Sequence, residues 1–84
     1  MATATPEPTP NPNAMKFQLD VTLEGTINVS SAADAPDDFT REVMGVGGVA
    51  SLFGVNDFVT VTRMPEGDWD AIVAAVQAAA GRHL

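Results

Sequence analysis

The amino-acid sequence predicts an α+β domain: a two-layer sandwich with a four-stranded antiparallel sheet and two helices on one face. Segments of apolar–polar alternation occur in pairs joined by short turns, which is typical of antiparallel hairpins. Each pair precedes a segment of helical periodicity, so the expected order is β-β-α-β-β-α. With 84 residues, the chain has room for one domain and one modest core.

The N-terminal segment is rich in proline. Residues 1–8 are expected to be a disordered tail, because their prolines exclude a helix and they offer few apolar side chains. Thr9–Asn13 predicts a turn, since asparagine side chains can bond to their own backbone. The folded domain is therefore expected to span residues 9–84.

Two segments predict hairpins. Within residues 15–29, apolar and polar side chains alternate over the first ten positions, after which Gly25 allows a bend. Residues 49–63 contain an apolar run and a β-branched alternating run, separated by Asn56-Asp57. We expect each segment to pair with itself as an antiparallel hairpin.

The two helices are expected near residues 38–45 and 68–82. Asp37 and Asp68 are suitable N-caps, and the glycines after residue 44 end the first helix. The second helix has an apolar stripe whose first residue, Trp69, is expected to be buried against the sheet. The stripe consists of Trp69, Ile72, Val73, Val76 and Ala80.

The charge balance narrows the range of partners. Eleven acidic residues against four basic ones give a net charge of −7. Nucleic acid and anionic membranes are not expected partners, because both attract clustered Lys and Arg. No signal peptide or membrane span is expected, and the cytoplasm is the expected location. The acidity favours solubility, and a surface complementary to a basic partner is the alternative.

The sequence offers little for catalysis. There is no cysteine, and the single histidine, His83, is expected to be solvent-exposed near the end of the chain. Acidic clusters at 34–42 and 66–70 are expected to cap helices rather than bind a metal. We expect no catalytic residue, no metal ligand and no cofactor, so the protein is not expected to be an enzyme.

Three stretches together resemble the N-terminal domain of the Nfu/NifU-like iron–sulfur scaffold and carrier proteins. Thr9–Phe17 is similar to the family's T-x-N-P-N-x-hydrophobic-K-F opening. Gly48-Val49 with Leu52-Phe53 comes next, followed by Asn56–Arg63 and then by Trp69. The resemblance covers residues 9 to 80. The chain departs from the family at Asp37-Asp38-Phe39, where relatives often have Ser-Pro before a hydrophobic residue.

The resemblance implies an accessory role. In the family, this domain is usually followed by one whose Cys-x-x-Cys motif holds the cluster, and no such motif occurs up to Leu84. Cluster binding is therefore not carried over. The expectation is a free-standing, monomeric protein-interaction module for iron–sulfur cluster assembly or delivery, with assembly or client proteins as partners. A regulatory or stress-related adaptor unrelated to iron is the alternative, and a small metal-dependent enzyme is less favoured.

Alternation along residues 58–63 predicts where a partner binds. If the helices pack on Val59 and Val61, Phe58 looks out from the uncovered face of the sheet. An exposed aromatic side chain is a plausible anchor for a protein partner. In the alternative, Thr9–Asn13 folds back across the sheet and covers Phe58. The expected partner-binding residues are Phe58, Thr60, Thr62, Lys16 and Gln18.

Overall fold

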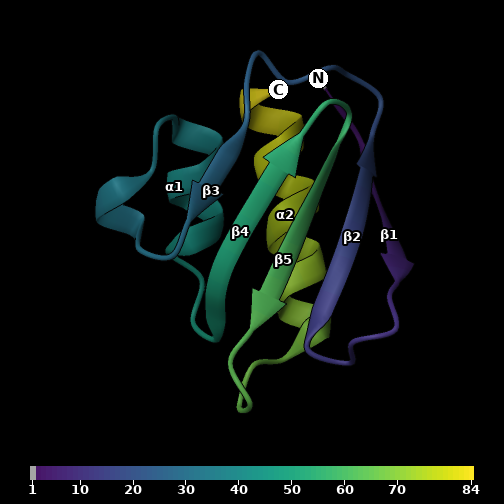
Figure 1. Cartoon of the computed structure of the whole chain (residues 1–84), viewed down its shortest axis with the longest axis vertical. Helices are drawn as coiled ribbons and strands as arrows, with labels where there is room; N and C mark the ends of the chain where they lie inside the picture. The colour runs from purple at the N-terminus through teal and green to yellow at the C-terminus, as the bar shows by residue number, and fades with distance from the viewer. Residues whose placement is uncertain (1) are drawn as a thin grey trace.

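The computed structural model describes residues 2–84 and shows a five-stranded antiparallel sheet with both helices behind it (Figure 1). The predicted α+β class is confirmed, but the sheet has five strands rather than four. The elements are β1 (Ala4–Pro8), β2 (Ala14–Leu19), β3 (Ile27–Val29), a 3₁₀ turn (Ala32–Asp34), α1 (Asp38–Met44), β4 (Val49–Val55), β5 (Phe58–Arg63) and α2 (Trp69–His83).

The additional strand comes from the segment expected to be a disordered tail. Ala4–Pro8 pairs antiparallel with β2, so the prediction of disorder over residues 1–8 is wrong for this part. Met1 lies outside the described residues. Ala2 and Ala4 are buried in the core, and the backbone N–H of Thr3 donates to Asp20 Oδ1 at 2.9 Å. Pairing with an existing strand supplies hydrogen bonds that composition alone does not reveal.

The prolines of β1 are compatible with an edge strand. Leu19 N donates to Asp57 O, on the β5 side of β2. Because the direction of the N–H groups alternates along a strand, those of Lys16 and Gln18 point to the other side, toward β1. There Lys16 and Gln18 lie opposite Glu7 and Thr5. Pro6 and Pro8 therefore lie at positions whose missing N–H faces the outer edge. No ladder hydrogen bond is lost there, and the edge cannot accept a further strand in regular pairing.

The first predicted hairpin is also wrong. The strand order is β1-β2-β5-β4-β3, so β2 and β3 lie on opposite sides of the β4–β5 hairpin and do not pair with each other. The connecting loop crosses the end of that hairpin, where Leu23 N donates to Asn56 O. Alternation identified both strands but not their neighbours. The second predicted hairpin is confirmed, with Asn56 at a positive φ of 55° in its turn.

The core lies between the sheet and the helices. The largest fully buried apolar side chains come from β2, β4 and β5 and from both helices. Both predicted caps are present: Asp37 Oδ1 accepts from Thr40 N at 2.7 Å, and Asp68 Oδ1 accepts from Asp70 N at 3.1 Å. The largest fully buried apolar side chains of the core are those of Phe17, Phe39, Val43, Leu52, Val59, Val61, Ile72 and Val76.

Candidate protein-binding face

One face of the sheet is not covered by either helix (Figure 1). Along β5, Val59 and Val61 are fully buried on the helical side, whereas Phe58, Thr60 and Thr62 are half-buried on the other. The alternation expected for this strand is therefore present. It directs three of the five predicted partner-binding residues to the uncovered face.

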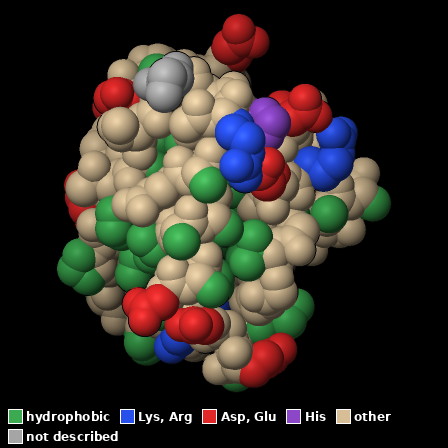
Figure 2. Space-filling view, turned by 180° about the vertical axis from the view of Figure 1, so that it is seen from behind, with side chains coloured by type: hydrophobic (Ala, Val, Ile, Leu, Met, Phe, Trp, Pro, Cys, Tyr) green, Lys and Arg blue, Asp and Glu red, His purple; other side chains and the backbone are tan. Residues whose placement is uncertain are grey.

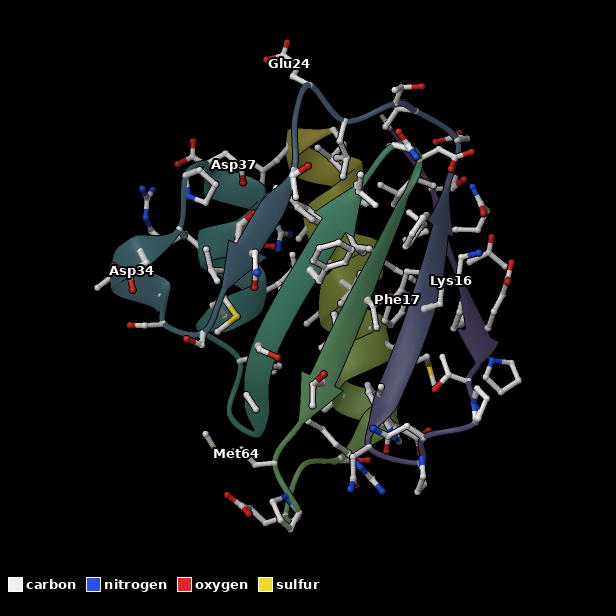
Figure 3. The ribbon with its side chains drawn as sticks, in the orientation of Figure 1. Lys16, Phe17, Glu24, Asp34, Asp37 and Met64 are labelled. Carbon is white, nitrogen blue, oxygen red and sulfur yellow. The ribbon has the colours of Figure 1, made fainter. Side chains whose placement is uncertain are left out.

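Lys16 and Gln18 of β2 share that face. Gln18 lies opposite Phe58, and Lys16 lies opposite Thr60. The Nζ atom of Lys16 is 4.8 Å from the centroid of the Phe58 ring, within cation–π range, and Figure 3 shows Lys16 on β2. Gln18 Nε2 donates to the carbonyl of Asp57 at 2.9 Å. All five predicted residues thus form one continuous group of side chains.

Sequence reasoning missed two apolar members of this group, both on β4. Phe53 lies opposite Thr60, and Val55 lies opposite Phe58. Phe53 is 41% exposed, one of two exposed large hydrophobic residues within residues 2–84. A register irregularity between Val49 and Ser51 changes the phase of β4, so the direction of its side chains could not be read from the apolar run. We name the following set the open-face patch: Lys16, Gln18, Phe53, Val55, Phe58, Thr60 and Thr62.

The Thr9–Asn13 turn lies at the opposite end of β5 from Phe58. Arg63 N donates to Asn13 O at 2.8 Å, and Trp69 Nε1 donates to Pro12 O at 3.0 Å. The turn therefore docks beside the start of α2, and the idea that it folds over Phe58 is wrong. Trp69 is half-buried rather than fully buried, and its indole N–H bonds to this turn.

The stretches that carry the family resemblance meet at this corner. Arg63 lies over the Trp69 ring, with its Cζ 5.4 Å from the ring centroid, and donates to Gly67 O at 3.1 Å. Gly48 has φ of 94°, and a Cβ on it would lie 2.6 Å from the Cα of Gly67. Asn11 Oδ1 accepts from Asn13 N at 2.9 Å. The signature residues thus have structural roles, joining the turn to α2.

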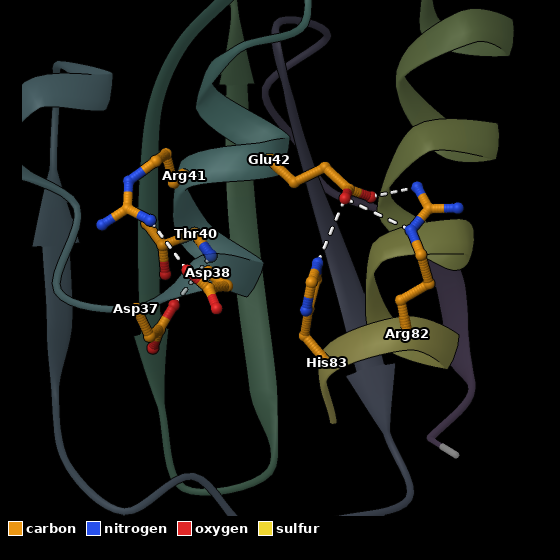
Figure 4. A network of polar contacts seen from close by, with 7 residues as sticks. All are labelled: Asp37, Asp38, Thr40, Arg41, Glu42, Arg82 and His83. Atoms are coloured by element: carbon orange, nitrogen blue, oxygen red, sulfur yellow. Dashed lines mark hydrogen bonds and ion pairs between the residues drawn. The ribbon is translucent and has the colours of Figure 1, made fainter.

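A polar cluster joins the two helices near the end of the chain. Glu42 of α1 contacts Arg82 and His83 of α2, with His83 Nε2 3.1 Å from Glu42 Oε1 (Figure 4). The hydrogen bond from Arg82 is the main cause that lowers the pKa of Glu42, and His83 adds to it. Seen from the helical side, basic and acidic side chains gather at this end (Figure 2). These contacts link α1 to α2 at the surface of the protein.

Within residues 2–84, the structure gives little support for a ligand site in a groove or for a metal site. A groove lies between the β2–β3 loop, the start of α1 and Leu84. Asp37, which borders it, is already used as a helix cap. Within residues 2–84, no group of three or more His, Asp or Glu side chains could hold a metal ion. Over the same residues, no helix is both long and apolar enough to cross a membrane.

The sequence of this chain matches a known protein family over most of its length. The family described as "Scaffold protein Nfu/NifU N terminal" matches residues 5–84. Conserved virulence factor C of Staphylococcus aureus strain bovine RF122 / ET3-1 is 32% identical over 75 residues, covering 87% of this chain and 20% of that protein. Conserved virulence factor C of Staphylococcus saprophyticus is 35% identical over 74 residues, covering 86% and 20%. The chain spans about a fifth of the length of these curated relatives.

Solved structures give the same fold. The crystal structure of protein SAV1430 from Staphylococcus aureus superposes with a TM-score of 0.82 at 30% identity, covering 94% of this chain and 98% of that one. The solution structure of SeR13 from Staphylococcus epidermidis has a TM-score of 0.67 at 20% identity and covers 98% of both chains. The second similarity concerns the fold alone.

Proposed function

Because the chain belongs to the family of Nfu/NifU scaffold N-terminal domains, we propose that it is a non-catalytic protein-interaction module that serves iron–sulfur cluster assembly or delivery. The open-face patch is the proposed docking surface. Its ligand is a protein of the assembly pathway or a client that receives the cluster. The cluster itself is held by that partner, since this chain has no cysteine.

The single observation that supports docking is an aromatic surface on an uncovered sheet face. Phe53 is 41% exposed, and Phe58 lies on the neighbouring strand, opposite Val55, with Lys16 Nζ over its ring. Aromatic side chains contribute large contact areas at interfaces, and threonines around them supply hydrogen-bonding groups. A rigid sheet loses little conformational entropy when it binds, which favours recognition over a flexible loop.

The polar groups outside the patch support a non-catalytic role. Asp37 and Asp68 accept backbone N–H groups at helix starts, and Glu42 is paired with Arg82 and His83. A general base must be free to exchange a proton with a substrate. Carboxylates that already cap or bridge helices are poorly suited to that task.

The proposal is tested with a double variant, Phe53→Ala with Phe58→Ala. Tagged wild-type and variant chains are used to capture proteins from native extract, and cluster-assembly proteins are then quantified by mass spectrometry. We expect the wild type to enrich assembly or client proteins and the variant to lose about tenfold or more of that enrichment, as for an interface anchor. Thermal melting of both chains shows whether the fold is retained.

Met64→Ala is the matched control. Met64 is 43% exposed, similar to Phe53, but lies beyond the end of β5 (Figure 3). The control should retain full enrichment. If the wild type enriches no assembly or client protein, the iron–sulfur role is wrong. If the double variant captures them as well as the wild type does, the partner binds elsewhere.

A further inference from the structure

The open-face patch is bordered by acidic side chains. Glu7 of β1 lies opposite Lys16, and its side chain has the same parity. Asp20 directly follows β2, and Asp57 lies in the turn before Phe58. The three arginines lie elsewhere: Arg41 on α1, Arg82 on α2, and Arg63 against the Trp69 ring. Glu7 and Asp20 therefore lie on the β1–β2 side of the apolar centre, and Asp57 lies at the tip of the β4–β5 hairpin next to it.

Asp20 is stabilised in its charged form in the folded protein. The backbone N–H of Thr3 donates to Asp20, which holds the pKa of that carboxyl below its usual range. Lys16 supplies the positive charge on this face, and its Nζ lies over the Phe58 ring. A partner with basic flanking groups would therefore meet complementary charge, whereas an acidic partner would meet like charge.

The shape of the sheet favours docking on its face rather than along its outer edge at β1. Pro6 and Pro8 leave that edge without regular N–H donors, so a peptide cannot extend the sheet there as a further strand. The opposite face of the same sheet already packs two helices against alternating apolar side chains (Figure 1). A helix is the element that the uncovered face can accept in the same way.

We propose that the open-face patch binds a basic amphipathic helix of a partner protein. The apolar stripe of this partner helix lies on Phe53, Val55 and Phe58. Lys or Arg side chains that flank the stripe reach Glu7, Asp20 and Asp57. This inference rests on the proposed function, because it specifies the partner class for the same surface. The bound helix would form a third layer, giving a helix–sheet–helix arrangement.

Two synthetic helical peptides test the charge and the site. Both carry the same leucine stripe, and the flanking positions are Lys and Arg in one and Glu in the other. Each is titrated into the isotopically labelled full chain, and amide shifts are followed by NMR at low and high salt. The basic peptide should shift amides of β4 and β5 around Phe53 and Phe58, and binding should weaken at high salt. The acidic peptide should bind at least about tenfold more weakly.

A charge variant and a matched control distinguish the effect of the acidic residues around the patch from the effect of the protein's overall negative charge. Glu7→Gln with Asp20→Asn and Asp57→Asn should weaken binding of the basic peptide about tenfold. Asp34→Asn with Glu66→Gln and Asp70→Asn removes the same charge elsewhere and should weaken it no more than about twofold. Equal binding of both peptides, shifts confined to the helical side, or equal weakening by the two variants would overturn the inference.

The two proposals fail in different ways. If neither peptide binds the patch while capture of assembly proteins still depends on Phe53 and Phe58, the basic-helix inference is wrong and the proposed function stands. If the basic peptide binds as expected but no assembly or client protein is captured, the partner class stands and the iron–sulfur role is wrong.

Discussion

Along β5, Val59 and Val61 are fully buried beneath the helices, whereas Phe58, Thr60 and Thr62 on the opposite face remain partly in contact with water. The two faces use the same backbone and the same hydrogen bonds, so they differ only in what their side chains contact. On the covered face, each large side chain supports the core. On the open face, side chains can change at little cost to the fold, and this makes that face available for recognition.

The largest expected effect is a difference in the free energy of unfolding between two variants, each of which truncates a phenylalanine on one face of the sheet. Phe17→Ala should cost about 3–5 kcal/mol of the free energy of unfolding, because Phe17 is fully buried and the change leaves a cavity. Phe58→Ala should cost about 1 kcal/mol or less, since its ring is partly in water already. Urea denaturation of both variants measures the difference. Similar losses would show that the open face also carries the fold.

The next effect concerns the corner that brings α2 onto the covered face. Gly48→Ala should cost about 2 kcal/mol or more, because its φ of 94° strains an L-residue and the new Cβ would meet Gly67. Gly47→Ala, where a Cβ has nothing within 4 Å, should stay within about 0.5 kcal/mol. The same denaturation experiment compares the neighbouring glycines. A tolerated Gly48→Ala would mean that this corner relaxes easily.

A smaller effect is expected at the docked turn. Trp69→Phe keeps an aromatic ring but removes the Nε1 donor to Pro12 O, which should cost about 1 kcal/mol. For a domain of this size, that corresponds to about 4–8 °C in melting temperature. Phe53→Leu on the open face serves as the comparison and should shift melting less. An unchanged melting temperature for Trp69→Phe would show that water replaces the lost bond.

The smallest effect is a pH dependence at the exposed pair between the helices. The folded pKa of Glu42 is lowered from its usual 4.5, chiefly by the Arg82 hydrogen bond. Its stabilisation is therefore present above about pH 4.5 and is lost as the pH falls through the lowered value. Glu42→Gln should melt slightly below the wild type at pH 7, and the gap should narrow at pH 3. Glu66→Gln is the control, and a constant gap would contradict the assignment.

Much of the candidate face could be predicted from residue parity. The alternation in β5 assigned Phe58 and Val59 to opposite faces of the sheet without any knowledge of the fold, because successive side chains in a strand point to opposite faces. Phe53 and Val55 could not be assigned in this way. The irregularity after Val49 shifts the phase of β4, and its position depends on pairing with β5.

The sequence by itself determined the elements that local chemistry controls: both helices with their aspartate caps, the Asn56-Asp57 turn, and the direction of side chains along β5. Tertiary structure decided which strands are neighbours. The pairing of Ala4–Pro8 with β2 and the separation of β2 from β3 depend on contacts between distant segments. The physical reason is that alternation and capping act within a few residues, whereas a strand's partner is selected by the core that all the elements bury together.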